Sequence, residues 1–175
     1  MYPRMKMRYL FTFSLMSIGL FSNAQICKYV VNEQDPLTDD IIRTVRTRLT
    51  GPTPYYYFSY IRNGSDYKFN VEVGDYGELD SPIPKDSELI MRAGNGEVIR
   101  MKAIESSTPE LIDDFGSKIT RYDITYQMTE QNMKDIAESG IVFIRIQDMK
   151  NTFSDQEIPA AVVQISKENG ECIFK

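Results

Sequence analysis

The strongest constraint on the fold is a pair of aromatic-rich segments on either side of Asn63-Gly64. Residues 55–61 (YYYFSYI) and 66–73 (DYKFNVEV) carry apolar residues at every second position, which is the period of a half-buried β-strand. Asn-Gly is the favoured pair for a two-residue type I′ turn between antiparallel strands. The sequence therefore predicts a β-hairpin over residues 55–73.

The turn also predicts which residues of this hairpin share a face. The face that we expect to be buried pairs Tyr60 with Tyr67, Phe58 with Phe69, and Tyr56 with Val71. The face that we expect to be wet pairs Tyr57 with Asn70, Tyr55 with Glu72, and Ser59 with Lys68. Two tyrosines are thus predicted on the polar side of the sheet.

Other segments are predicted from local patterns. Residues 41–50 are rich in β-branched residues and predict a strand. Glu88–Ala93 and Glu97–Ile104 predict a second hairpin that turns at Gly94-Asn95 and pairs Ile90 with Ile99. Apolar residues occur on both of its faces, so we expect another element to cover it. Residues 74–87 and 106–118 are predicted as loops.

One helix has both of its ends marked in the sequence. Thr129 suits an N-cap and Gly140 suits a helix end. Met133, Ile136 and Ala137 form an apolar stripe at helical spacing. These signals predict a helix at about 129–139, between strands at 119–127 and 141–146.

The tail at 159–169 leaves two alternatives open. Pro159 and Gly170 suit the start and end of a helix, whereas Asn169-Gly170 also suits a turn between two strands. We favour the helix, because Pro-Ala-Ala is a poor opening for a strand. The predicted fold class is α+β: an antiparallel, hairpin-built sheet with one capped helix and this C-terminal helix.

Residues 1–24 have the pattern of a secretory signal peptide: a basic start, a short apolar core, and small residues before Gln25. An uncleaved anchor and lipidation of Cys27 are the alternatives, although Ile26 is too large for the usual lipidation signal. We expect one exported domain, residues 25–175, that is periplasmic or secreted and has no membrane span after cleavage. Cleavage removes three of the 20 basic residues and none of the 25 acidic ones, which leaves a net charge of −8.

The two cysteines, Cys27 and Cys172, lie near the two ends of the expected exported domain. An even pair in an oxidising compartment predicts a disulfide, and two free buried thiols are the alternative. The negative net charge and the lack of a basic cluster argue against nucleic acid as a partner.

The residue types also limit the chemistry. The chain has no histidine, which excludes Ser-His-Asp catalysis and histidine metal sites. It has no phosphate-binding or dinucleotide motif, so we expect no cofactor and no enzymatic activity. Carboxylates remain: Asp75, Glu78 and Asp80 form a weak calcium candidate, and a small carboxylate-dependent hydrolase is the alternative function.

The predicted polar face of the first hairpin is the best candidate for binding. It carries Tyr55 and Tyr57 together with Lys68 and Asn70, and tyrosine offers a broad apolar surface with a polar group. The leading hypothesis is a non-catalytic envelope module that binds an unknown protein or glycan. An inhibitor or structural accessory protein is a further alternative.

Several segments resemble small uncharacterised exported proteins of Bacteroidetes-type bacteria. They are Cys27-Lys-Tyr29, Asn32-Glu-Gln-Asp35-Pro36, Gly94-Asn-Gly-Glu-Val-Ile99, and Tyr122 with Gly140-Ile-Val-Phe-Ile-Arg-Ile146. The Ser-Asn-Ala-Gln sequence at the expected cleavage site is similar too. The resemblance implies an exported domain without an assigned activity, so it contributes no functional residue.

Overall fold

The computed structural model describes residues 27–49, 55–114, 116–147 and 153–175, so the expected signal peptide lies outside the described residues. The described chain forms ten strands and two helices. In order they are β1 (Tyr29–Gln34), β2 (Ile41–Arg48), β3 (Tyr55–Asn63), β4 (Asp66–Tyr76), β5 (Glu88–Ala93), β6 (Val98–Lys102), β7 (Glu110–Asp114), β8 (Ser117–Met128), α1 (Glu130–Ser139), β9 (Ile141–Gln147), β10 (Phe153–Glu157) and α2 (Ala160–Phe174).

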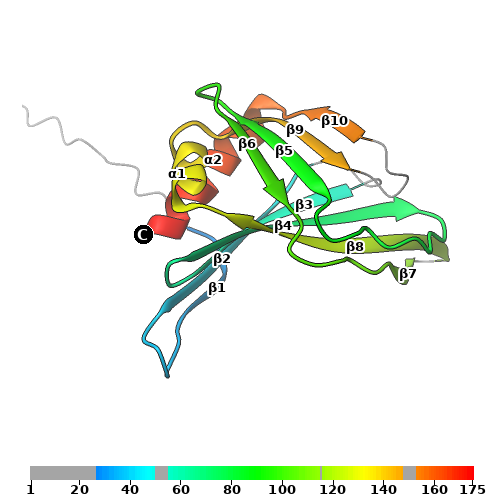
Figure 1. Cartoon of the computed structure of the whole chain (residues 1–175), viewed down its shortest axis with the longest axis horizontal. Coiled ribbons are helices and arrows are strands. Elements are labelled where there is room, and N and C mark those ends of the chain that lie inside the picture. The colour runs from blue at the N-terminus through cyan, green and yellow to red at the C-terminus, as the bar shows by residue number, and fades with distance from the viewer. Residues whose placement is uncertain (1–26, 50–54, 115, 148–152) are drawn as a thin grey trace, which may run out of the picture.

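The strands form two antiparallel sheets. The larger sheet has six strands in the order β1-β2-β3-β4-β8-β7, and the smaller has four in the order β10-β9-β5-β6. The smaller sheet and both helices lie on the same side of the larger sheet (Figure 1). The core fills the space between them, which gives the predicted α+β architecture in a form dominated by strands.

The first hairpin forms with the predicted faces but not with the predicted register. Tyr60 lies opposite Phe69 rather than Tyr67, and Asn63 pairs with Asp66. The two turn residues are therefore Gly64 and Ser65, with Gly64 at a φ of 58°. Glycine at the first central position is typical of a type II′ turn. Because the shift is two residues, the faces are unchanged, and Tyr56, Phe58 and Tyr60 are all buried.

The predicted register of the second hairpin is wrong by one residue. Met91, not Ile90, lies opposite Ile99. The Ala93 N–H donates to the Glu97 carbonyl, so the loop has three residues and ends on Gly96 at a φ of 92°. This longer loop places Met91 and Ile99 in the core and leaves Val98 54% exposed. We expected another element to cover both faces of this hairpin, but among the described residues Val98 is left largely uncovered.

Both helices are present. In α1, Thr129 Oγ accepts a hydrogen bond from the Asn132 N–H at 3.1 Å, as expected of an N-cap, and Gly140 ends the helix. The tail forms α2, which settles the alternatives in favour of a helix. The helix continues through Gly170 to Phe174 instead of ending there.

Some strand segments lie where the sequence predicted loops or where we made no prediction. β7 occupies part of 106–118, β10 follows β9, and β4 continues to Tyr76, inside the predicted 74–87 loop. β7 and β10 have five residues each and lie at the edges of their sheets. Such short edge strands show too few alternating positions to be recognised locally.

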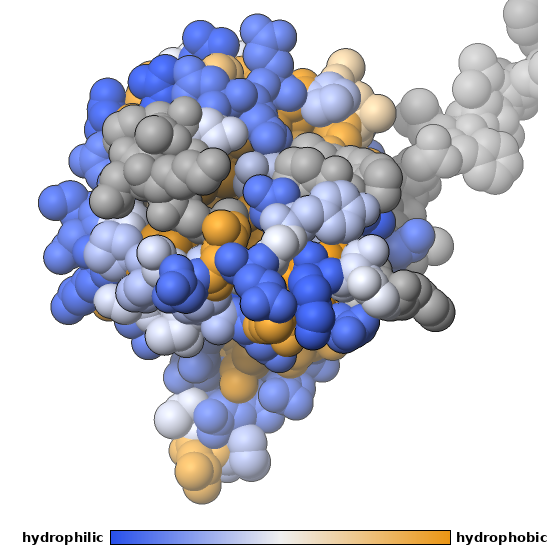
Figure 2. Space-filling model, turned by 90° about the vertical axis from the view of Figure 1, so that its right-hand side faces the viewer, coloured by the Kyte–Doolittle hydropathy of each residue, from blue (hydrophilic) through white to orange (hydrophobic). Residues whose placement is uncertain are grey.

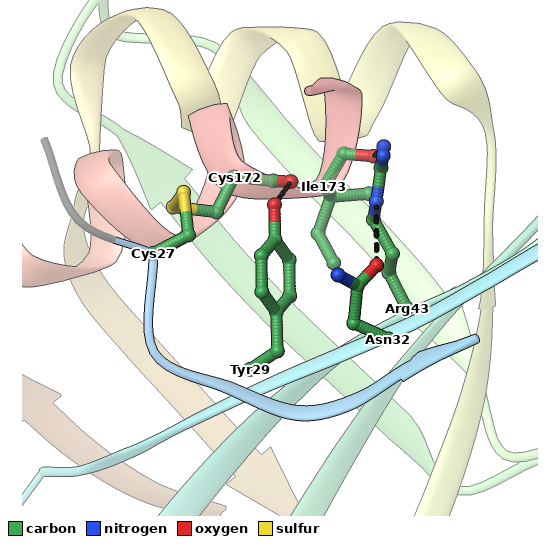
Figure 3. Close-up of a disulfide and its surroundings, with 6 residues drawn as sticks. All are labelled: Cys27, Tyr29, Asn32, Arg43, Cys172 and Ile173. Carbon is green, nitrogen blue, oxygen red and sulfur yellow. Dashed lines mark hydrogen bonds between the residues drawn. A yellow bond between two sulfur atoms is a disulfide. The ribbon is translucent and has the colours of Figure 1, made fainter. Parts of the chain in front are cut away.

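A disulfide between Cys27 and Cys172 joins the two ends of the described chain, as predicted (Figure 3). Next to it, the Tyr29 hydroxyl donates to the Cys172 carbonyl at 2.9 Å. Arg43 and Arg62 both donate to the Ile173 carbonyl, at 3.4 and 3.2 Å. The last turn of α2, where backbone carbonyls lack helical partners, is thus attached to β1, β2 and β3.

The β1–β2 hairpin extends away from the rest of the molecule (Figure 1). Its tip projects below the body in Figure 2 and is apolar in colour. Leu37 in this turn is 93% exposed. The hairpin therefore shares no core with the second sheet at its far end.

Candidate binding site

The candidate site is the side of the six-stranded sheet that faces away from the second sheet and the helices, here called the outer face. Residues that lie directly opposite each other on neighbouring strands form rows across it. One row is Arg48, Tyr57, Glu72 and Asp123, and the next is Tyr55, Gly74, Arg121 and Glu110. The predicted wet face of the first hairpin is the centre of this surface.

Tyr57 is held by an arginine that is itself ion-paired. The Arg46 guanidinium carbon lies 4.1 Å from the centre of the Tyr57 ring. Arg46 Nη2 is 2.6 Å from Glu72 Oε2, and the Glu72 side chain is only 12% exposed. Because the Arg46 guanidinium contacts both Glu72 and the Tyr57 ring, it has a defined position over that ring. Tyr57 therefore keeps a defined position on a half-exposed surface.

Tyr55 lies against the backbone of the neighbouring strand. A Cβ atom added at Gly74 would be 2.3 Å from two carbons of the Tyr55 ring, so any larger residue would displace the ring. The rings of Tyr55 and Tyr57 are 5.5 Å apart and inclined at 69°. Burial, followed by the nearby Glu72 carboxylate, raises the pKa of the Tyr55 hydroxyl, which therefore stays protonated at neutral pH.

Lys68 and Asn70 lie on the same face, but neither contacts the aromatic pair in the described contacts. Lys68 Nζ pairs with Asp66 at 3.1 Å, and Asn70 donates to Thr125 Oγ at 3.3 Å. A hydrogen bond from Gln127, with a smaller contribution from Lys68, lowers the pKa of Asp66. The two residues border the site rather than form its centre.

The sequence did not predict the residues that complete the site. Arg46 comes from β2 and Arg121 from β8, and both reach β3 and β4 only through strand pairing. The alternation of Thr and Arg in β2 could have predicted part of the site, because it places Arg46 and Arg48 on the face opposite Val45.

A polar hollow of about 600 Å³ adjoins the far end of the Tyr55 row. Arg121 forms part of its wall, where it hydrogen-bonds Glu110 and lies 3.9 Å from Asp123. Its lining consists of Glu105, Ser106, Ser107, Thr108, Pro109, Glu110, Arg121 and Asp123. This set offers hydroxyl groups and carboxylate acceptors around one guanidinium donor.

The calcium candidate does not form a metal centre in the described structure. Asp75 lies on β4 and accepts a hydrogen bond from the Tyr76 N–H at 2.8 Å. Within the described ranges, no group of three or more acidic or cysteine side chains is placed to hold a metal ion, and this includes Asp75, Glu78 and Asp80. The carboxyl groups whose pKa values shift clearly, Asp66, Glu130 and Asp155, all shift downward.

Comparison with known proteins adds no family to these observations. No protein-family model, curated protein or solved structure matches the chain. None of the helices in the described part of the chain is long and apolar enough to cross a membrane. The outer face of the six-stranded sheet therefore holds the candidate functional residues.

Proposed function

We propose that the protein is a non-catalytic exported module of the bacterial envelope, and that it binds its partner on the outer face of the six-stranded sheet. The observation that supports this most is the Tyr55–Tyr57 pair, with rings 5.5 Å apart, both partly exposed on a polar face. Tyrosines with a fixed position lose little conformational freedom on binding, and they are enriched at recognition surfaces.

Two further features support the proposal of an exported binding module. Glu72 and Arg46 hold Tyr57, while Gly74 leaves room for Tyr55, so the surface is organised before any ligand arrives. The disulfide between Cys27 and Cys172 suits an oxidising compartment such as the periplasm or the cell exterior. Export itself, with cleavage before Gln25, remains part of the proposal.

Binding of labelled protein to the host's envelope fraction tests this function. We expect wild-type protein to sediment with the envelope and Tyr57→Ala to bind about tenfold more weakly, a loss of roughly 1.4 kcal/mol. Arg92→Ala is the matched control, because it also removes an arginine–aromatic contact, with Phe143, but on the second sheet. Equal loss in both variants, or no binding of the wild type, would contradict the proposal.

A further inference from the structure

The Tyr55 ring and the polar hollow belong to one continuous row of the outer face. Tyr55, Gly74, Arg121 and Glu110 lie directly opposite one another on β3, β4, β8 and β7. Neighbouring strands are about 4.8 Å apart, so the Cα atoms of Tyr55 and Arg121 are about 10 Å apart. This span is comparable with the length of a disaccharide.

The two ends of the row offer different chemistry. At one end, the ring of Tyr55 lies against the backbone at Gly74 and is partly exposed, with the Arg48 guanidinium carbon 5.9 Å from its centre. The electron-rich face of an aromatic ring attracts the slightly positive C–H groups of a sugar ring. At the other end, carboxylates and hydroxyl groups surround Arg121, and these groups accept from and donate to sugar hydroxyls.

From this juxtaposition we propose that the outer face binds a neutral oligosaccharide of at least two units. One pyranose ring stacks on the exposed part of the Tyr55 ring, and the next unit is hydrogen-bonded in the hollow by Arg121, Asp123 and Ser106. This inference rests on the proposed binding function and specifies its ligand class.

The charges around the site favour a neutral ligand over an acidic one. Arg46 is paired with Glu72, and Arg121 is paired with Glu110. The hollow contains further carboxylates at Glu105 and Asp123. An acidic sugar in the hollow would therefore meet more like charge than opposite charge, which disfavours binding.

Titration calorimetry with purified protein tests the ligand class. The probes are short neutral oligosaccharides of glucose, mannose, xylose and N-acetylglucosamine in increasing length, with oligogalacturonates as the acidic counterparts. We expect a neutral series to bind, with disaccharides and longer chains tighter than the monosaccharide. Tighter binding of the oligogalacturonates than of any neutral series would overturn the proposal.

Variants along the row separate stacking from other effects. Tyr55→Ala should weaken binding about tenfold, while Tyr55→Phe keeps the ring and should bind like the wild type. Gly74→Ala retains Tyr55 but pushes its ring off the sheet, so it should also weaken binding. Asp123→Asn alters the hollow without touching the ring and should weaken binding as well. Unchanged affinity in Gly74→Ala and Asp123→Asn would contradict this geometry.

Treatment of the host's envelope fraction separates this inference from the proposed function. Periodate cleaves the vicinal diols of sugars, whereas a broad protease removes protein. We expect periodate treatment to abolish Tyr57-dependent binding and protease treatment to leave it. The opposite result would replace the glycan by a protein partner while the binding function stands. If wild-type protein binds neither the envelope nor any oligosaccharide, both proposals fail.

Discussion

Gly170 of α2 lies against Ala137 of α1 so closely that a Cβ atom at position 170 would be 2.8 Å from the Ala137 Cα. Gly170→Ala should therefore destabilise the protein by about 1–3 kcal/mol, through overpacking of the helix interface. Helix propensity alone predicts the opposite sign, a gain of about 1 kcal/mol. Urea unfolding distinguishes the two, and a more stable variant would show that the helices do not meet at this position.

The disulfide should contribute about 2–4 kcal/mol to the free energy of unfolding, because it closes a loop with a sequence separation of 145 residues. Urea unfolding with and without reductant measures this contribution. A variant with Cys27→Ser and Cys172→Ser controls for other effects of the reductant and should not respond to it. Alkylation of two free thiols in oxidised wild-type protein would show that the bridge is absent.

Neighbouring residues of β3 should differ sharply in their effect on stability. Phe58 is 1% exposed and its ring lies 5.2 Å from that of Phe69, so Phe58→Ala should cost about 3–5 kcal/mol. Tyr57→Ala loses the contacts with Arg46 and with the Tyr55 ring on a half-exposed face and should cost about 1 kcal/mol. Thermal and urea unfolding compare the two, and similar losses would mean that both faces of the sheet are core.

The Tyr126 hydroxyl is buried without a hydrogen-bond partner among the described residues. Burial raises its pKa above the ordinary value of 10.0. Above about pH 10 the unfolded chain loses this proton while the folded chain keeps it, so stability should fall as the pH rises. Tyr126→Phe should therefore lose less stability between neutral and alkaline pH than the wild type.

Unfolding at neutral pH gives the control for the tyrosine prediction. Tyr126→Phe removes an unsatisfied hydroxyl and should be at least as stable as the wild type. Tyr122→Phe removes a hydroxyl that donates to the Ser81 carbonyl at 2.9 Å and should be about 1 kcal/mol less stable. A large loss in Tyr126→Phe would reveal a partner for that hydroxyl.

The elements that were predicted well depend on local signals. Thr129 and Gly140 flank α1 and signal its two ends, and the alternation around Tyr56 and Phe58 assigns the two faces of β3 independently of the pairing register. The wrong register at Met91 has a local cause, because Gly96 makes the loop one residue longer than an Asn-containing turn suggested. A one-residue shift exchanges the faces, whereas the two-residue shift in the first hairpin does not.

The parts that were missed depend on contacts between distant segments. Gly170 looked like a helix end, but its lack of a side chain serves the contact with α1. Arg46 and Arg121 join the tyrosines only once β2 and β8 pair with the central hairpin. No pattern within a single segment contains that pairing, so the sequence predicted Tyr55 and Tyr57 but not the residues that hold them.

Hydroxyl-radical footprinting of tyrosines tests the central claim, that the ligand covers the outer face, most directly. The oxidation of Tyr55 and Tyr57 is measured with and without the host's envelope fraction, and Tyr29, which contacts α2 on the opposite side of the sheet, serves as the internal reference. We predict that the ligand lowers the oxidation of Tyr55 and Tyr57 and leaves that of Tyr29 unchanged. Binding that leaves the oxidation of Tyr55 and Tyr57 unaltered would place the ligand elsewhere and contradict the account.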